Sequence, residues 1–297
     1  LTSDMRITEL TVIKNLIDNI DKTREKINQV QLKIATGKEI NTVSDNPYIA
    51  NSIMNLKAMI NRNEQFQKNI DDAIDFLTAT GDALDNFINT LIDIKSLLVE
   101  ISNSAREPDY ETYANRLGEL FKQLLDSANT NFKGKYIFNG TNTKVKPFSY
   151  DEKNDLLISD LSNGEIKFEV NDGVYEKVNF TVEEIFGGRE IFDLVHQIKN
   201  SLKNKIKPDI SLLQRFEQLF ENIVSNSSEV GALVNRFNLL RKQIEKQNLI
   251  LTELLSIRQD TDIAQQAINL QKGQLILESA YMLAGKIIQK SIIDYLR

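Results

Sequence analysis

The chain has 297 residues and a net charge of −6, and 41% of its residues are hydrophobic and 26% are charged, so it is long enough to bury a sizeable core. No apolar run approaches the roughly 18–20 residues of a membrane span, and no basic stripe with interleaved aromatic residues indicates nucleic-acid binding. The absence of cysteine excludes disulfides, cysteine-based zinc sites and thiol catalysis, and the single histidine, His196, is expected to pack on a helix. We therefore expect neither an enzyme nor a bound metal or cofactor.

The first predicted helix covers residues 5–36, where apolar side chains recur at alternating spacings of four and three. These positions are Ile13, Leu16, Ile20, Thr23, Ile27, Val30 and Ile34. A spacing of this kind indicates a helix that packs lengthwise on another helix. Gly37 follows it and suits a helix C-cap, so the chain is expected to bend there.

The second predicted helix begins at Ser44-Asp45-Asn46-Pro47, which combines side chains that cap helix N-termini with a proline suited to the first helical position. Apolar residues at the same spacing continue from Ile49 to Ser102. An unbroken helix from Pro47 to Ser104 would be about 85 Å long, at 1.5 Å per residue. This element is therefore expected to be a rod.

A third helix is predicted from Asp109 to about Asn131, and the apolar period then changes to two over residues 135–188. Strands are predicted at residues 136–138, 148–150, 156–158, 166–170 and 178–180. They are separated by dipeptides that favour tight hairpin turns, namely Asn139-Gly140, Asn163-Gly164 and Asp172-Gly173. The segment is expected to be a small antiparallel β domain inserted into a helical protein.

Helices are predicted to resume over residues 189–205, again after Pro208-Asp209, and finally over residues 257–297. The last helix repeats the spacing of the first helix, at Ile263, Ala267, Leu270, Gln274, Leu277, Tyr281, Ala284, Ile288, Ser291 and Tyr295. Ile276, Leu283 and Ile287 widen its apolar stripe beyond a two-helix contact, so this helix needs more than one neighbour.

The two terminal helices are expected to pair as a coiled coil, and the alternative is that they are two separate helices of an ordinary bundle. The predicted fold class is mainly α with a β insertion, built from long antiparallel helical rods, a terminal coiled coil and a small antiparallel β domain. Three domains are predicted: residues 5–36 with 257–297, residues 37–134 with 189–256, and residues 135–188. The apolar positions of the terminal helices are expected to form an assembly interface rather than the core of a monomer.

Several motifs resemble those of the flagellin superfamily. Residues 37–47, from Gly37 to Pro47, resemble the bend after its first helix, and Asp260 to Ala264 resemble the opening of its last helix. The segment Val230-Gly231-Ala232-Leu233-Val234-Asn235-Arg236-Phe237 is similar to the LGA-x-x-NR signature of its returning helix. Within the superfamily, the hook-associated protein 3 family is matched by the Met-Arg-Ile-Thr start at Met5, the Ser-Asp-Asn-Pro bend and the run from Ala128 to Thr141. The resemblance covers nearly the whole chain.

This resemblance implies an extracellular structural protein of the bacterial flagellum, at the junction between hook-associated protein 1 and the flagellin filament. It implies self-assembly into a ring or helical layer through the terminal helices. It also implies export through the flagellar type III apparatus, with a dedicated chaperone that binds the C-terminal region. No cleavable signal peptide is expected, which agrees with that route.

Two alternatives stay open at this point. A short flagellin would share the plan and would form the filament itself. A coiled-coil tethering or signalling module would use the rods as a lever and the β domain to bind a ligand. An enzyme is not indicated, because the sequence offers no nucleophile–base pair, no glycine-rich phosphate loop and no ligand cluster.

Overall fold

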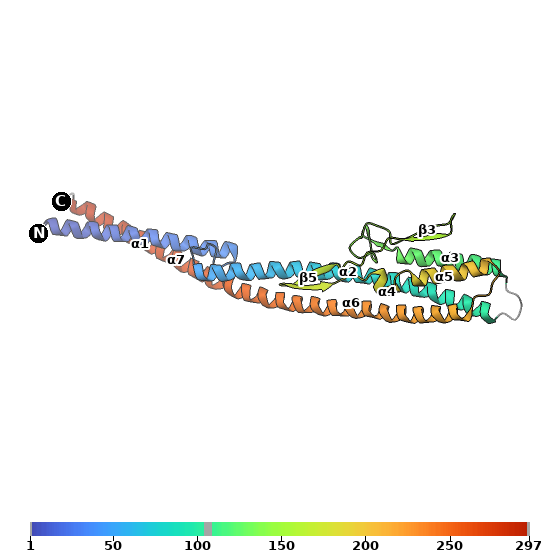
Figure 1. The fold of residues 1–297 in the computed structure, drawn as a ribbon. Helices are drawn as coiled ribbons and strands as arrows, with labels where there is room; N and C mark the ends of the chain where they lie inside the picture. The colour runs from blue at the N-terminus through green and yellow to red at the C-terminus, as the bar shows by residue number, and fades with distance from the viewer. Residues whose placement is uncertain (1, 104–108, 296–297) are drawn as a thin grey trace. The chain divides into compact units, whose positions relative to one another are not determined.

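The computed structural model describes residues 2–103 and 109–295, with the side chains of residues 11–103 and 109–286. Its contacts divide the chain into two units, Leu1–Arg62 with Asn248–Arg297, and Asn63–Gln247. Long helices with a small region of antiparallel strand pairs confirm the predicted fold class (Figure 1). The three domains predicted from the sequence remain a prediction. Over the described residues, every helix is too short or too polar to cross a lipid bilayer.

The first unit contains the two terminal helices, α1 (Thr2–Thr36) and α7 (Ile263–Tyr295). It also contains the start of α2 (Pro47–Asn103) and the end of α6 (Ile210–Gln259). The predicted helix end at Thr36 and the predicted helix start at Pro47 are both confirmed. Gly37 has a φ of +69°, a left-handed conformation that glycine adopts at little cost and that ends the first helix.

The second unit contains the remainder of α2 and α6, together with α3 (Tyr110–Ala128) and α5 (Glu190–Lys203), which lie in contact with each other (Figure 1). The Asp109 carboxylate accepts a hydrogen bond from the backbone N–H of Thr112 and caps α3. A short helix, α4 (Val182–Phe186), was not predicted. It is marked in the sequence by a capping box between Thr181 and Glu184.

The strands form three separate two-stranded antiparallel sheets rather than one larger sheet. The pairs are β1 (Asn131–Phe132) with β2 (Lys135–Tyr136), β3 (Phe148–Asp151) with β4 (Leu156–Ser159), and β5 (Lys167–Asn171) with β6 (Val174–Lys177). We call residues 131–181, which hold all three pairs, the hairpin segment. The strands predicted at 148–150, 156–158 and 166–170 are confirmed, and no strand end differs from its predicted position by more than one residue.

Two predicted strands and two predicted hairpin turns are wrong. Residues 178–180 are not a strand, because the side chain of Asn179 accepts the hydrogen bond of Ile166 N that a strand partner would otherwise take. Only Tyr136 of the strand predicted at 136–138 belongs to a sheet, and Ile137 and Phe138 enter the core. The turns at 139–140 and 163–164 do not join paired strands, whereas Asp172-Gly173 does.

The core of the second unit is built around phenylalanine rings from several elements. Phe87 of α2 lies 4.4 Å from Phe186 of α4, and Phe192 of α5 lies 4.3 Å from Phe148 of β3, measured between ring centroids. Phe138 of the hairpin segment packs against Phe186 at 5.1 Å. The hairpin segment therefore shares one hydrophobic core with the helices.

The single histidine belongs to a polar cluster on the same core. The carboxylate of Asp155 accepts hydrogen bonds from Lys199 at 2.7 Å and from the hydroxyl of Tyr150, and it lies 3.1 Å from Nε2 of His196. Burial would raise the pKa of Asp155, but these hydrogen bonds outweigh it and hold that pKa well below its ordinary value. Burial and the hydrogen bond to Asp155 raise the pKa of Tyr150. The cluster fastens the β3–β4 hairpin to α5.

Candidate assembly interface

The terminal helices α1 and α7 lie side by side in the first unit, as the sequence predicted (Figure 1). Ile20 and Ile27 are buried between them. The other predicted contact residues Ile13, Leu16, Val30, Ile34, Leu270, Leu277 and Ala284 are partly buried. Ile263 and Tyr281 are more exposed, and the side chains of Ile288 and Tyr295 lie outside the described residues.

Two contacts bring the terminal helices close together. A Cβ atom at Gly273 would lie 2.9 Å from Cγ1 of Ile27, so the helices approach there to a distance that only glycine permits. Arg24 donates a hydrogen bond to the hydroxyl of Tyr281 at 2.8 Å, and its guanidinium lies 5.6 Å from the centre of that ring. Neither contact was predicted, although Gly273 in the middle of an otherwise helix-favouring sequence was a signal that could have indicated it.

Much of the apolar surface of α7 has no partner among the described residues. Leu275, Ile276, Met282 and Leu283 are 55–58% exposed. An open groove of about 350 Å³ runs along the pair, lined by Leu16, Leu275, Ile276, Ser279, Ala280 and Leu283. The sequence predicted that one partner helix would leave Ile276, Leu283 and Ile287 in water. Ile276 and Leu283 are exposed as expected, and the side chain of Ile287 lies outside the described residues. Contiguous apolar surface of this kind marks an interaction site.

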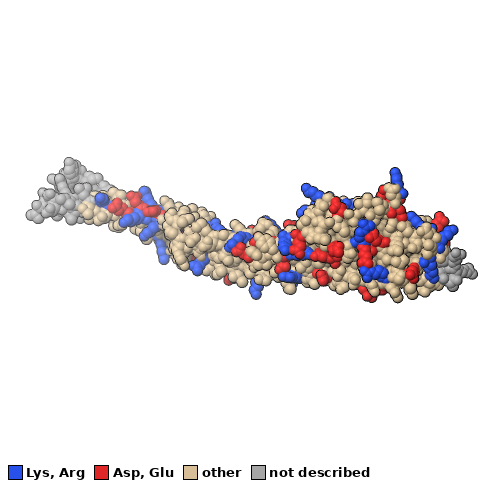
Figure 2. All heavy atoms as spheres, viewed as in Figure 1, with Lys and Arg blue, Asp and Glu red and all other residues tan. Residues whose placement is uncertain are grey.

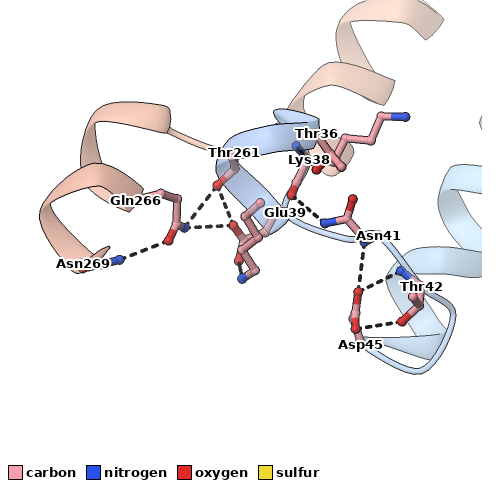
Figure 3. A network of polar contacts seen from close by, with 10 residues as sticks. Thr36, Lys38, Glu39, Asn41, Thr42, Asp45, Thr261, Gln266 and Asn269 are labelled. Atoms are coloured by element: carbon pink, nitrogen blue, oxygen red, sulfur yellow. Dashed lines mark hydrogen bonds and ion pairs between the residues drawn. The ribbon is translucent and has the colours of Figure 1, made fainter. Parts of the chain in front are cut away.

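The bend after α1 is tied to the bend before α7 through Glu39 (Figure 3). The Glu39 carboxylate accepts hydrogen bonds from Lys33 Nζ at 2.5 Å, Thr261 Oγ1 at 2.7 Å and Gln266 Nε2 at 3.2 Å. The backbones are joined as well, because Glu39 N donates to Gln259 O at 2.7 Å and Thr261 N donates to Gly37 O at 3.0 Å. We call this set of contacts the Glu39 clasp. The clasp was not predicted, because Thr261 and Gln266 lie more than two hundred residues from Glu39 along the chain.

The residues before α2 have distinct roles. The Asn46 side chain accepts a hydrogen bond from Ile49 N at 3.2 Å and caps the helix. Asp45 instead holds the bend, since its carboxylate accepts hydrogen bonds from the backbone N–H groups of Asn41 and Thr42 (Figure 3). These bonds lower the pKa of Asp45. Ser44 is exposed, and its hydroxyl has no hydrogen-bond partner among the described residues.

The resemblance motif on α6 is buried at its two ends, Val230 and Phe237, whereas its four signature residues lie on the surface of the second unit. Gly231, Ala232 and Asn235 are exposed. Arg236 forms an ion pair with Glu176 of β6 at 2.5 Å, so it ties the hairpin segment to α6. A Cβ atom at Gly231 would meet no atom within 4 Å, so close helix packing inside this unit does not require that glycine.

Comparison with protein families finds two matching models. The chain matches the bacterial flagellin N-terminal helical region over residues 7–143 and the bacterial flagellin C-terminal helical region over residues 213–296. Together these models cover most of the chain, including α1, α2, α6 and α7. No curated protein matches it.

Several solved structures have a similar fold. A flagellar hook-associated protein from Vibrio parahaemolyticus is 18% identical, with a TM-score of 0.64, over 72% of this chain and 99% of that one. Flagellar hook-associated protein-3 from Legionella pneumophila is 16% identical, with a TM-score of 0.59, over 69% and 98%. FlgL from Bacillus cereus is 24% identical, with a TM-score of 0.57, over 71% and 100%. At these sequence identities the similarity shows a shared fold.

Proposed function

This chain belongs to the flagellin family, and we propose that it forms the junction layer between hook-associated protein 1 and the flagellin filament of a bacterial flagellum. The observation that carries the proposal is the apolar surface of α7 that its partner helix α1 leaves uncovered. The fold shared with hook-associated proteins supports the junction, as opposed to the filament.

Assembly follows from the physical properties of the terminal helices. Burial of apolar surface contributes about 25 cal/mol per Å², whereas ordering a residue costs roughly 1–2 kcal/mol, so a pair of isolated helices gains little. Neighbouring copies that cover Leu275, Ile276, Met282 and Leu283 add burial at a smaller ordering cost. Subunits related by a rotation and a rise meet through two different surfaces, and such contacts build a ring or a helical layer.

The remaining parts of the proposal follow from family membership. The protein would be a structural component outside the cell without enzymatic activity, exported through the flagellar type III apparatus. Its partners would be further copies of itself, hook-associated protein 1 and flagellin, with a chaperone that holds the C-terminal region before export. Exposed apolar residues on α7 suit a chaperone, because they need cover before assembly.

To test the interface, the Leu275→Asp/Met282→Asp variant is expressed in cells that do not produce the unmodified protein. We expect hooks without filaments and flagellin released into the medium, because charges on this surface oppose burial between copies. Leu239→Asp on α6, also strongly exposed, is the matched control and should leave the flagella normal. Normal filaments in the Leu275→Asp/Met282→Asp strain would contradict the proposed interface.

The location is tested separately with the unmodified protein. Antibody labelling in electron micrographs should mark a single band where hook and filament meet. Labelling along the whole filament, or long filaments grown from the purified protein alone, would instead identify a short flagellin. The flagellin family models make this the second candidate function.

A further inference from the structure

A groove of about 400 Å³ lies between α2 and α6 in the second unit. Its lining combines apolar side chains, small residues and two carboxylates, and includes Leu77, Gly81, Asp82, Leu84, Asp85 and Gly231. Gly81 and Gly231 come from the two different helices. The groove is distinct from the apolar surface of α7, which belongs to the other unit.

The two glycines keep this groove open without serving the packing of the chain itself. A Cβ atom at either position would meet no atom within 4 Å. Each glycine lies inside a long helix, where it destabilises the helix relative to alanine. Since no contact within the described chain requires them, the space that they leave suits an occupant from outside.

The rim of the groove carries negative charge that the chain does not neutralise. Asp82 and Asp85 are exposed and have no ion pair among the described residues. Nearby carboxylates on the same helix are paired, since Asp71 lies 3.7 Å from Arg241 and Asp75 lies 3.2 Å from Lys133. The unpaired carboxylates would favour a cationic occupant.

The loop that connects β2 to β3 in the same unit carries positive charge, opposite to that of the groove. Lys144 and Lys146 are exposed there and have no ion pair among the described residues. Figure 2 shows Lys or Arg side chains that project from the upper edge of the second unit, on the side where Figure 1 places β3. The loop offers its lysines to solvent.

This loop is held rigid from beneath by Asn139, whose side chain is completely buried. The Asn139 amide nitrogen donates hydrogen bonds to the backbone oxygens of Val145 and Asp160, each at 3.0 Å. Its side-chain oxygen accepts a hydrogen bond from Ser162 N at 2.8 Å. A loop fixed before contact loses little conformational freedom when it binds, which favours association.

We propose that the lysine loop, residues 141–147, of one copy docks in the acidic groove of the neighbouring copy within the layer. The inference rests on the proposed function, because it requires a layer of copies, and it names the surfaces that meet. The occupant is a second copy because this chain itself carries both complementary surfaces. Groove and loop are different surfaces, so each copy can bind one neighbour with its groove and another with its loop.

The first experiment fills the groove with Gly81→Leu and Gly231→Leu. Both substitutions replace glycine by a better helix former in open space, so the melting temperature of the purified chain should be unchanged or higher. Assembly should nevertheless fail, seen as hooks without filaments. Normal flagella in cells with this variant would overturn the proposal. If the variant melts at a lower temperature, the two glycines are needed for the stability of the chain itself, and this result would also overturn the proposal.

The second experiment reverses charges. Asp82→Lys/Asp85→Lys and Lys144→Glu/Lys146→Glu should each reduce the number of filaments more than about tenfold, since like charges then face each other. The chain that carries all four substitutions should recover, because the attraction is restored. The control pair, Asp72→Lys/Lys153→Glu, lies on exposed positions outside the groove and the loop and should have no effect. Failure of the four-substitution chain to recover would overturn the proposal.

The third experiment uses the absence of cysteine from the chain. Cells that produce both Asp85→Cys and Lys144→Cys chains should yield a disulfide-linked dimer in isolated flagella, whereas either variant alone should not. A disulfide from Asp85→Cys to a cysteine of another flagellar component, in place of the dimer, would assign the groove to a different occupant and overturn the proposal. If the unmodified protein is absent from the junction, the proposed function fails. If it is present and no dimer forms, this inference alone fails.

Discussion

At the scale of single residues, Gly273 decides how closely the terminal helices approach. The nearest atom to a Cβ there would be Cγ1 of Ile27. Rotation about χ1 is restricted in a β-branched side chain, so this atom cannot move aside easily. We expect Gly273→Leu to weaken the α1–α7 pair by about 1–3 kcal/mol through overpacking. Gly285→Leu is the control, because a Cβ at Gly285 meets nothing within 4 Å. Hydrogen exchange of the α1 amides should become faster in the first variant and not in the second.

The contribution of Glu39 to the stability of the bend after α1 depends on pH. Hydrogen bonds from Lys33 and Thr261 hold the pKa of its carboxyl below the ordinary value of 4.5. The ionised carboxylate therefore stabilises the bend fully above pH 4.5, and this stability is lost as the pH falls through the lowered folded-state pKa. Glu39→Gln should remove that acid dependence from the protease resistance of the bend. Glu25→Gln, at an exposed position on α1, should leave it in place.

At the scale of elements, the start of α2 depends on one capping side chain rather than on the whole capping motif. Asn46→Ala removes the hydrogen bond to Ile49 N and should cost about 1 kcal/mol of helix stability. Ser44→Ala should cost almost nothing, because its hydroxyl has no hydrogen-bond partner among the described residues. Hydrogen exchange in the first turns of α2 measures both. If Ser44→Ala accelerated this exchange as much as Asn46→Ala, both side chains would contribute to the cap.

At the scale of the whole molecule, the hairpin segment is part of the core of the second unit. Phe148 is completely buried against Phe192, so Phe148→Ala should lower the unfolding free energy by about 3–5 kcal/mol. Tyr175→Ala, at an exposed position on β6, should change it by no more than about 0.5 kcal/mol. Urea unfolding followed by circular dichroism gives both values. If Phe148→Ala unfolds like the control, the hairpin segment is an independent insertion.

The long helices could be predicted from the sequence alone, which also favoured pairing of the two terminal helices over two separate helices of a bundle, and the contact between α1 and α7 confirms that pairing. Helix α2 could be predicted because its apolar spacing is regular and local, and because Asn46-Pro47 marks its start. The apolar stripe of α7 is wide enough to predict from sequence that Ile276 and Leu283 would remain exposed beside α1. Such patterns are readable because each depends only on residues a few positions apart.

The specific side-chain contacts between distant residues depend on the tertiary structure. The Glu39 clasp joins residues more than two hundred positions apart, and no local pattern brings Thr261 to that carboxylate. Dipeptides such as Asn139-Gly140 favour a hairpin locally, but Asn139 is instead buried to support the lysine loop. The glycines that line the acidic groove, Gly81 and Gly231, face open space, which the sequence cannot indicate because glycine is equally suited to a turn, a close contact or a gap. The free energy of such contacts depends on which segments meet in space, and only the folded chain determines that.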